Sequence, residues 1–168
     1  MDVLFQNTYV RNKDLAKEIY SFYYFRRPVR IFCHIALLLC IFLRVYSIIF
    51  FGWDTIDYFV LLYSFLLILQ IPLYFHQVNT MVKRDLELSG DEITVTTNVT
   101  EDYIENINSI GAKTQLRYEN IKKCNETKNL ILLFSKANMI YIFRKDSFVH
   151  GTADEFKAFI RNKGIKVR

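Results

Sequence analysis

The stretch IFCHIALLLCIFLRVYSIIFF, residues 31–51, decides what kind of protein this chain is. It is almost entirely apolar, yet it carries His34 and Arg44. Taken as residues 29–51, the run would form about 35 Å of helix at about 1.5 Å per residue. That length exceeds the roughly 30 Å thickness of the hydrocarbon core of a bilayer. Length and composition therefore predict a tilted membrane span rather than a core helix of a soluble protein.

A second apolar run follows at once. Residues 56–75 (IDYFVLLYSFLLILQIPLYF) are also long enough to cross a bilayer. Only residues 52–55 (GWDT) separate the two runs, and they include an interfacial tryptophan. Two spans joined so closely predict an antiparallel helical hairpin.

The charges that flank the two runs predict the orientation of the hairpin. Basic residues stand before the first run and after the second, whereas the connecting turn contains no Lys or Arg. By the positive-inside rule, both ends of the chain are then cytoplasmic and the turn faces outward. The residues that we expect to anchor the spans at the two interfaces are Arg26, Arg27, Arg30, Trp53, Lys83 and Arg84.

Among the polar side chains inside the runs, His34, Arg44 and Gln70 are the ones that test the prediction of a membrane span. A central arginine costs about 2.5–3.5 kcal/mol on insertion scales, and less when it can snorkel. Arg44 must bend against the N-terminal lean of helical side chains to reach outer headgroups or Asp57. The hairpin register places His34 and Gln70 at one depth, where they can hydrogen-bond. In one interpretation, the three residues form a polar path or a ligand site. In the other, His34 and Gln70 join the two helices by a hydrogen bond, and Arg44 anchors the first helix at the interface. We favour the second interpretation because two helices enclose no interior.

Composition and motifs exclude several classes of protein. The net charge is +5, but much of the basic excess lies beside the apolar runs, which favours lipid over nucleic acid as a partner. Cys33, Cys40 and Cys124 lack the spacing of a disulfide framework or a zinc site, so we expect buried structural thiols and no cofactor or metal. Nucleotide-binding, nucleophile and HExxH motifs are absent from the sequence, which predicts a non-enzyme.

Outside the hairpin the chain has the pattern of a globular protein. Residues 3–10 are prone to form a strand, and residues 12–28 have the spacing of an amphipathic helix at the cytoplasmic interface. Period-2 alternation predicts β-hairpins over residues 85–99 and residues 129–146. Residues 113–118 form a further short strand between them.

The remaining segments complete an α+β domain. We expect residues 101–111 to be an irregular polar loop and residues 119–123 to form a one-turn element. Thr152 and Glu155 have the spacing of a capping box, which predicts a C-terminal helix. A small antiparallel sheet closed by that helix is the expected architecture. Because an isolated strand is unstable, we expect residues 3–10 to pair with the edge of this sheet.

The expected organisation has three parts. Residues 1–28 hold the N-terminal strand and juxtamembrane helix, residues 29–78 the transmembrane hairpin, and residues 79–168 the cytoplasmic β-rich domain.

Element order and two sequence segments resemble the YcxB-like family of bacterial membrane proteins. The segments are FRRP at residues 25–28 and LRYENIKKCNETKNLILLFSKANMIYIFRKDSF at residues 116–148. The chain departs from the family pattern at Tyr118, where the family has tryptophan, and at Phe143, where it has proline. The resemblance implies a cytoplasmic domain similar to bacterial pleckstrin-homology-like (PH-like) folds, tethered to the bacterial plasma membrane by two helices.

The expected function is that of a membrane-anchored, non-enzymatic binding or scaffold module. Its cytoplasmic domain would engage a protein or an anionic lipid headgroup, and homo-oligomerisation is left open. The alternative is a membrane-embedded self-immunity protein against a secreted toxin or bacteriocin, for which the outer turn and Arg44 would matter most. The residues that we expect to contact a partner or lipid form a basic rim: Lys122, Lys123, Arg144, Lys145 and Tyr118.

Overall fold

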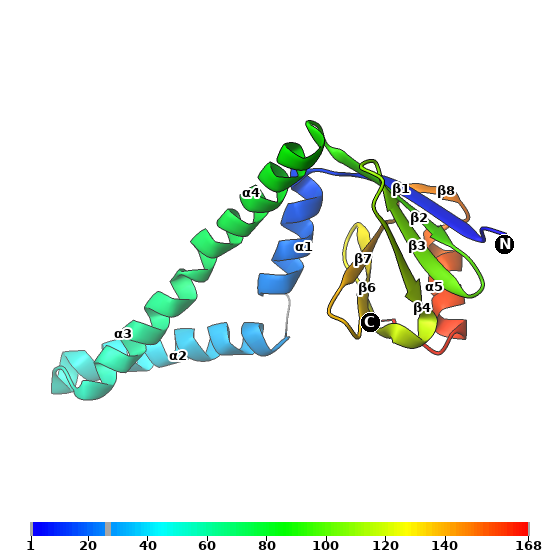
Figure 1. Ribbon diagram of the computed structural model, residues 1–168. Helices are drawn as coiled ribbons and strands as arrows, with labels where there is room; N and C mark the ends of the chain where they lie inside the picture. The colour runs from blue at the N-terminus through cyan, green and yellow to red at the C-terminus, as the bar shows by residue number, and fades with distance from the viewer. Residues whose placement is uncertain (1, 26–27, 168) are drawn as a thin grey trace. The chain divides into compact units, whose positions relative to one another are not determined.

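The computed structural model describes residues 2–25 and 28–167, apart from the side chains of residues 28–30 and 51. The chain divides into two compact units (Figure 1). Met1–Asn12 and Lys83–Arg168 make a β-rich unit, and Lys13–Val82 makes a helical unit. The N-terminal strand therefore belongs with the residues that follow the helices. The α+β class expected from the sequence is confirmed.

The helical unit is built from long apolar helices. It contains α1 (Lys13–Phe25), α2 (Pro28–Phe51), α3 (Thr55–Ile68) and most of α4 (Gln70–Ser89). Two segments, Ile31–Phe50 and Thr55–Ser89, are long and apolar enough to cross a membrane, and neither has its apolar window buried within the chain. These are the two candidate spans that the sequence predicts.

Local signals fix the turn between α2 and α3. Gly52 adopts a positive φ of 80° and donates its N–H to the carbonyl of Ile48 at 3.0 Å, which ends α2. Asp54 then caps α3, and its backbone N–H donates to Oδ2 of Asp57 at 2.7 Å in a capping box. The turn is thus specified within a few residues.

The second apolar helix runs further than the sequence predicts. The expected hairpin over residues 85–99 is wrong in its first half, because α4 continues to Ser89 and places Leu86 and Leu88 on exposed helical positions. Two alternating leucines are too few to separate a strand from a helix. The helix ends only at Gly90, which has a φ of 71° and donates to the carbonyl of Leu86 at 2.8 Å.

The β-rich unit contains two antiparallel sheets rather than the single sheet that we expected. The first has the order β4-β3-β2-β1-β8 and the second the order β5-β6-β7. The strands are β1 (Phe5–Arg11), β2 (Ile93–Val99), β3 (Tyr103–Asn108), β4 (Lys113–Arg117), β5 (Ile121–Glu126), β6 (Leu130–Ser135), β7 (Ile140–Arg144) and β8 (Phe148–His150). Helix α5 (Ala153–Asn162) follows, opened by the predicted capping box of Thr152 and Glu155.

Two segments differ from the sequence-based expectation. Strand β3 replaces the predicted irregular loop, and β5 begins within the predicted one-turn element, after a 3₁₀ turn at Tyr118–Asn120. The sequence of β3, YIENIN, hides its alternation because the inward positions after Ile104 are the amides Asn106 and Asn108. Cross-strand pairing with β2 and β4 supplies the stability that its own pattern does not indicate.

Strand β1 pairs with β2 along its whole length, from Phe5 opposite Val99 to Arg11 opposite Ile93. It also pairs with β8, so it is an interior strand and not the edge addition that we expected. The pairing itself is confirmed. As a result, β1, which precedes the helical unit, and β2, which follows it, are hydrogen-bonded to each other.

The core of this unit lies where the sheets and α5 meet. Phe143 and Phe156 are fully buried, with ring centroids 4.3 Å apart. Phe5 of β1 packs edge-on against Phe156 at 5.6 Å, which brings the N-terminal strand into the same cluster. Burial of large aromatic side chains from separate segments holds the two sheets and the helix together.

Candidate functional site

The five residues of the predicted basic rim do not form one surface. Lys122 and Lys123 lie at the start of β5, and Lys123 is opposite Phe134. Arg144 lies at the end of β7, opposite Leu130, which is the far end of β6 from Phe134. The register therefore places the two basic pairs at opposite ends of the three-stranded sheet.

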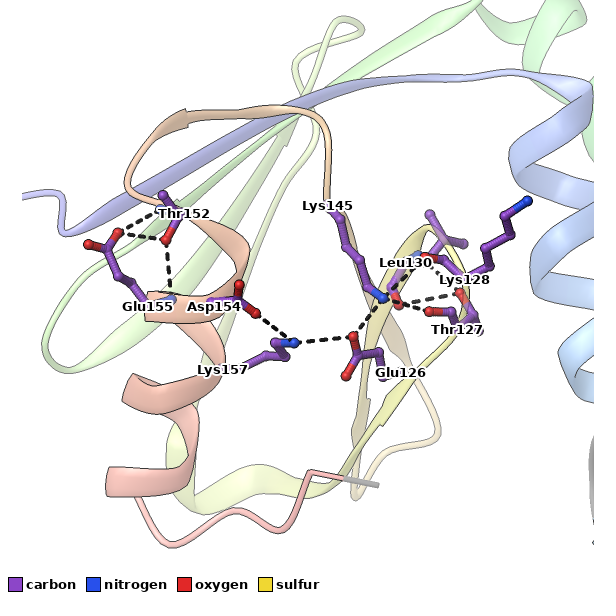
Figure 2. A network of polar contacts seen from close by, with 9 residues as sticks. All are labelled: Glu126, Thr127, Lys128, Leu130, Lys145, Thr152, Asp154, Glu155 and Lys157. Atoms are coloured by element: carbon purple, nitrogen blue, oxygen red, sulfur yellow. Dashed lines mark hydrogen bonds and ion pairs between the residues drawn. The ribbon is translucent and has the colours of Figure 1, made fainter.

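Lys145 is engaged in contacts within the chain (Figure 2). Its Nζ lies 2.6 Å from Oε1 of Glu126 and donates to the carbonyls of Thr127 at 2.7 Å and Lys128 at 3.1 Å. An ammonium has three donors, and here each has an acceptor. Lys145 thus closes the turn between β5 and β6.

Glu126 extends this network to α5. Its Oε1 also lies 3.2 Å from Nζ of Lys157, which pairs in turn with Oδ1 of Asp154 at 2.8 Å. Hydrogen bonds from Lys145, and secondarily from Lys157, hold the pKa of the Glu126 carboxyl below its usual range although partial burial acts against this. The pKa of Lys157 is raised by Asp154 and Glu126. The arrangement fastens α5 to the β5–β6 turn.

Arg144 is paired in a similar way. Its Nε and Nη2 donate to the two carboxylate oxygens of Asp146 at 3.1 and 2.8 Å, a fork that lowers the pKa of Asp146. The backbone of Arg144 is held by Asn7 of β1, which donates to its carbonyl at 2.7 Å and accepts from its N–H at 3.1 Å. Asn7 is fully buried. Arg144 therefore connects the two sheets.

Tyr118 also makes contacts within the chain, to the residue that follows β2 and to α5. Its hydroxyl donates to the carbonyl of Thr100 at 2.5 Å, and its ring meets that of Phe159 at 5.6 Å. Nζ of Lys163 lies 5.2 Å from the Tyr118 ring centroid and pairs with Glu101. Burial, aided by Glu101, raises the pKa of the Tyr118 phenol.

Two lysines of the predicted rim remain. Lys122 is exposed on β5. Nζ of Lys123 lies 4.7 Å over the ring of Phe134. Of the five residues, Lys122 is best placed to meet a partner directly.

Three of the predicted interface anchors, Trp53, Lys83 and Arg84, have described side chains. Arg26 and Arg27 lie outside the described residues, as does the side chain of Arg30. Trp53 is 63% exposed at the α2–α3 turn. Lys83 and Arg84 are exposed on the polar part of α4.

An aromatic cluster that the sequence analysis did not identify as a unit joins α1 to α4. The ring of Tyr74 lies 6.3 Å from that of Tyr24 and 5.5 Å from that of Phe25. Phe75 follows at 5.1 Å from Tyr74. Tyrosines at two helix ends, 50 positions apart in sequence, give no local signal that they meet.

The polar residues inside the apolar helices have different environments. Nε of Arg44 donates to Oδ1 of Asp57 at 2.7 Å, as the sequence allows. Oε1 of Gln70 is buried and has no hydrogen-bond partner among the described residues.

The described residues show no group of three or more His, Cys, Asp or Glu side chains placed to hold a metal ion. Cys124 is fully buried in the core of the β-rich unit, and burial raises the pKa of its thiol to about 12. A thiol with this pKa is a poor nucleophile at neutral pH and acts as a small apolar side chain.

Comparison with known proteins identifies the β-rich unit. No curated protein and no solved structure matches the chain significantly. Residues 99–160, from the end of β2 to the last full turn of α5, match the family model of the YcxB-like proteins. This match confirms the resemblance that the sequence analysis found, over these residues of the chain.

Proposed function

We propose that this protein is a membrane-anchored, non-enzymatic binding module. The apolar helices cross the bacterial plasma membrane as a hairpin, and the β-rich unit lies in the cytoplasm, where it binds a protein or an anionic lipid. The observation that carries the proposal is the pairing of β1 with β2 on either side of the helical segment.

The pairing constrains the number of spans. β1 precedes the apolar helices and β2 follows them, and their hydrogen-bonded register runs from Phe5–Val99 to Arg11–Ile93. Both strands must therefore lie on one side of any membrane that the helices cross. Only an even number of spans satisfies this condition, and the described residues contain two candidate segments. The basic residues beside them favour the cytoplasmic side.

The positions of aromatic residues at the two ends of the hairpin support its proposed length across the membrane. Trp53 and Tyr58 meet at the turn with ring centroids 6.4 Å apart, and Tyr74 lies in the cluster at the opposite end. From Trp53 to Tyr74 the helical rise amounts to about 31 Å. This matches the roughly 30 Å hydrocarbon core, with aromatic belts at both boundaries. The polar end of α4 then lies in water.

Cysteine labelling tests this topology. In a Cys33→Ala, Cys40→Ala background, Trp53→Cys and Lys122→Cys are each exposed to a membrane-impermeant maleimide on intact cells. We expect Trp53→Cys to react before lysis and Lys122→Cys only after it, while the buried Cys124 stays unreacted. Labelling of Lys122→Cys on intact cells would place the β-rich unit outside and refute the proposed topology.

Photocrosslinking tests the binding function. A probe at Lys122 is placed on the exposed cation of β5, and a probe at Trp53 reports on the outer turn. We expect Lys122 to capture a cytoplasmic protein or an anionic lipid. Capture of a secreted peptide at Trp53, with no capture at Lys122, would support the self-immunity alternative instead.

A further inference from the structure

The β-rich unit contains a cavity of about 270 Å³ that none of the features above uses. It is lined by β1, β2, β3 and β4 of the five-stranded sheet and by β7 of the other sheet. Its floor follows the strand register: Tyr9 and Asn108 both stand opposite Val95, and Asn106 stands opposite Thr114. The cavity lies toward the end of β1 that leads into the helical segment.

The polar groups that line the cavity are chiefly donors. Oδ1 of Asn106 accepts from the hydroxyl of Thr97 at 2.7 Å. Oδ1 of Asn108 accepts from the backbone N–H of Ala112 at 2.7 Å. Each carbonyl oxygen thus already accepts one hydrogen bond within the unit, and the two NH₂ groups are the groups of these side chains that can donate to a ligand. Burial raises the pKa of the Tyr9 phenol, so that it keeps its proton at neutral pH.

Arg11 adds a cation whose pairing is incomplete. Its Nε lies 3.1 Å from Oδ2 of Asp85, whose side chain is 5% exposed. Both atoms are buried, yet neither makes a well-aligned hydrogen bond within the described part of the chain. A buried charged donor left without an aligned acceptor is costly. The Arg11 side chain lines the cavity, so its guanidinium brings a positive charge to the site.

The rest of the lining is apolar. Val95 of β2 and Ile140 and Ile142 of β7 line the same cavity. A ligand that fits both the polar and the apolar parts of the lining has a negatively charged acceptor group and a compact apolar body. The planar pair of carboxylate oxygens matches the fork of a guanidinium and two amide donors.

We propose that this cavity binds a small organic carboxylate, held by Arg11, Asn106 and Asn108 and packed against Val95, Ile140 and Ile142. The carboxylate competes with Asp85 for Arg11. Because of this competition, removing the charge of Arg11 should weaken ligand binding, whereas removing the charge of Asp85 should strengthen it. It is independent of the topology proposed above.

The test uses the full-length protein in detergent micelles and 4-fluorobenzoate as the probe, with binding followed by ligand-observed ¹⁹F NMR. We expect saturable binding by the wild type. Arg11→Met should weaken it at least tenfold, whereas Asp85→Asn should strengthen it severalfold because it removes the competing carboxylate. Arg117→Met, which removes an exposed cation of β4, is the matched control and should bind as the wild type does.

A second pair of variants keeps the test valid if Arg11→Met fails to fold. Ala112→Leu narrows the cavity without removing a polar group, and Ala137→Leu adds the same side chain at an exposed turn. We expect loss of binding only for Ala112→Leu.

Three results would overturn the proposal. Equal binding by Arg11→Met and the wild type would assign the signal to the micelle or to another surface. Equal binding of the neutral 4-fluorobenzyl alcohol would show that the charge is not recognised. Competition by inorganic phosphate at the same concentration as the carboxylate would show that the apolar walls play no part.

Discussion

Arg44 of α2 and Asp57 of α3 face each other across the apolar helices, with Nε of Arg44 2.7 Å from Oδ1 of Asp57. The second oxygen of Asp57 accepts the N–H of Asp54 at 2.7 Å, so one carboxylate both neutralises the arginine and caps α3. The Asp57 side chain is 2% exposed. In the proposed hairpin, the pair allows two charges to lie within the apolar segment, where neither is stable alone.

We predict that Arg44→Leu destabilises the hairpin, because it leaves the Asp57 carboxylate without its cation. Asp57→Asn should do the same by stranding the arginine, although its amide oxygen can still cap α3. The double variant Arg44→Leu/Asp57→Asn should recover most of the loss. Unfolding in detergent, followed as a double-mutant cycle, measures the coupling. Strictly additive losses would show that the two residues do not stabilise each other.

Asn7 provides a second prediction. Its amide satisfies both backbone groups of Arg144. Asn7→Ala should destabilise the β-rich unit by about 1–3 kcal/mol for each group left unsatisfied. Thermal unfolding followed by circular dichroism measures the loss. Asn98→Ala, which removes only a partly exposed bond to Gln6, is the matched control and should cost less than 1.5 kcal/mol. Equal losses would show that the inter-sheet bridge is unimportant.

Deletion of residues 1–10 should have a larger effect than either point variant. β1 is an interior strand, so the deletion separates β8 from the sheet and exposes the edge of β2. We expect unfolding or aggregation, measured by size-exclusion chromatography of the detergent-solubilised protein. Unchanged solubility and melting would contradict the observed strand order.

The Glu126 network predicts a pH dependence of stability. The folded-state pKa of Glu126 is lower than the ordinary value of about 4.3. A depressed carboxyl pKa stabilises the fold above the unfolded-state value, and this contribution is lost as the pH falls through the folded-state value. The difference in unfolding free energy between the wild type and Glu126→Gln should therefore be constant above about pH 5 and shrink below about pH 4. Denaturant titrations at several pH values measure it.

The control for this prediction is Glu119→Gln. Glu119 is 71% exposed and lies 3.9 Å from Arg117, so its removal should leave both the stability and its pH dependence nearly unchanged. If Glu126→Gln gave the same flat profile as Glu119→Gln, the link between α5 and the β5–β6 turn would not contribute to stability.

Gly151 is predicted to be intolerant of a side chain for two reasons. Its φ of 75° disfavours any L-residue, and a Cβ there would lie 2.9 Å from Cε1 of Phe5 and closer still to Cδ1. Phe5 is held by Phe156 and Phe159, so the ring cannot move freely. Gly151→Ala should destabilise the unit more than Gly111→Ala, where φ is 84° but the space is open. Equal changes in melting temperature would mean that the Phe5 ring yields.

Several elements were predictable from the sequence because their signals are local. The apolar length of α2, the turn at Gly52 and Asp54, the β6–β7 hairpin and the capping box at Thr152 each depend on neighbouring residues. Hydrophobic periodicity and helix-end chemistry act over a few positions, and no distant segment competes with them here. The family resemblance depends on the same contiguous stretch.

The elements that the sequence analysis missed depend on pairing with other strands, which the residue pattern of one segment does not show. β3 is stable because β2 and β4 flank it, and β1 becomes an interior strand only when β8 returns to its free edge. The register places Lys122 and Lys123 at the other end of the three-stranded sheet from Arg144, and Glu126 and Asp146 pair with Lys145 and Arg144. The sheet register is not visible in local composition.

The sequence alone determined the two apolar helices, their turn and the α+β class, because solvent preference and helix-end hydrogen bonds are properties of contiguous residues. Only the tertiary structure decided that residues 5–11 pair with residues 93–99 and that Arg11 meets Asp85 beside a cavity. Strand pairing and ion pairing join groups separated by the whole helical segment. The energies of these pairings depend on distances in space, and these distances cannot be read from the order of the residues.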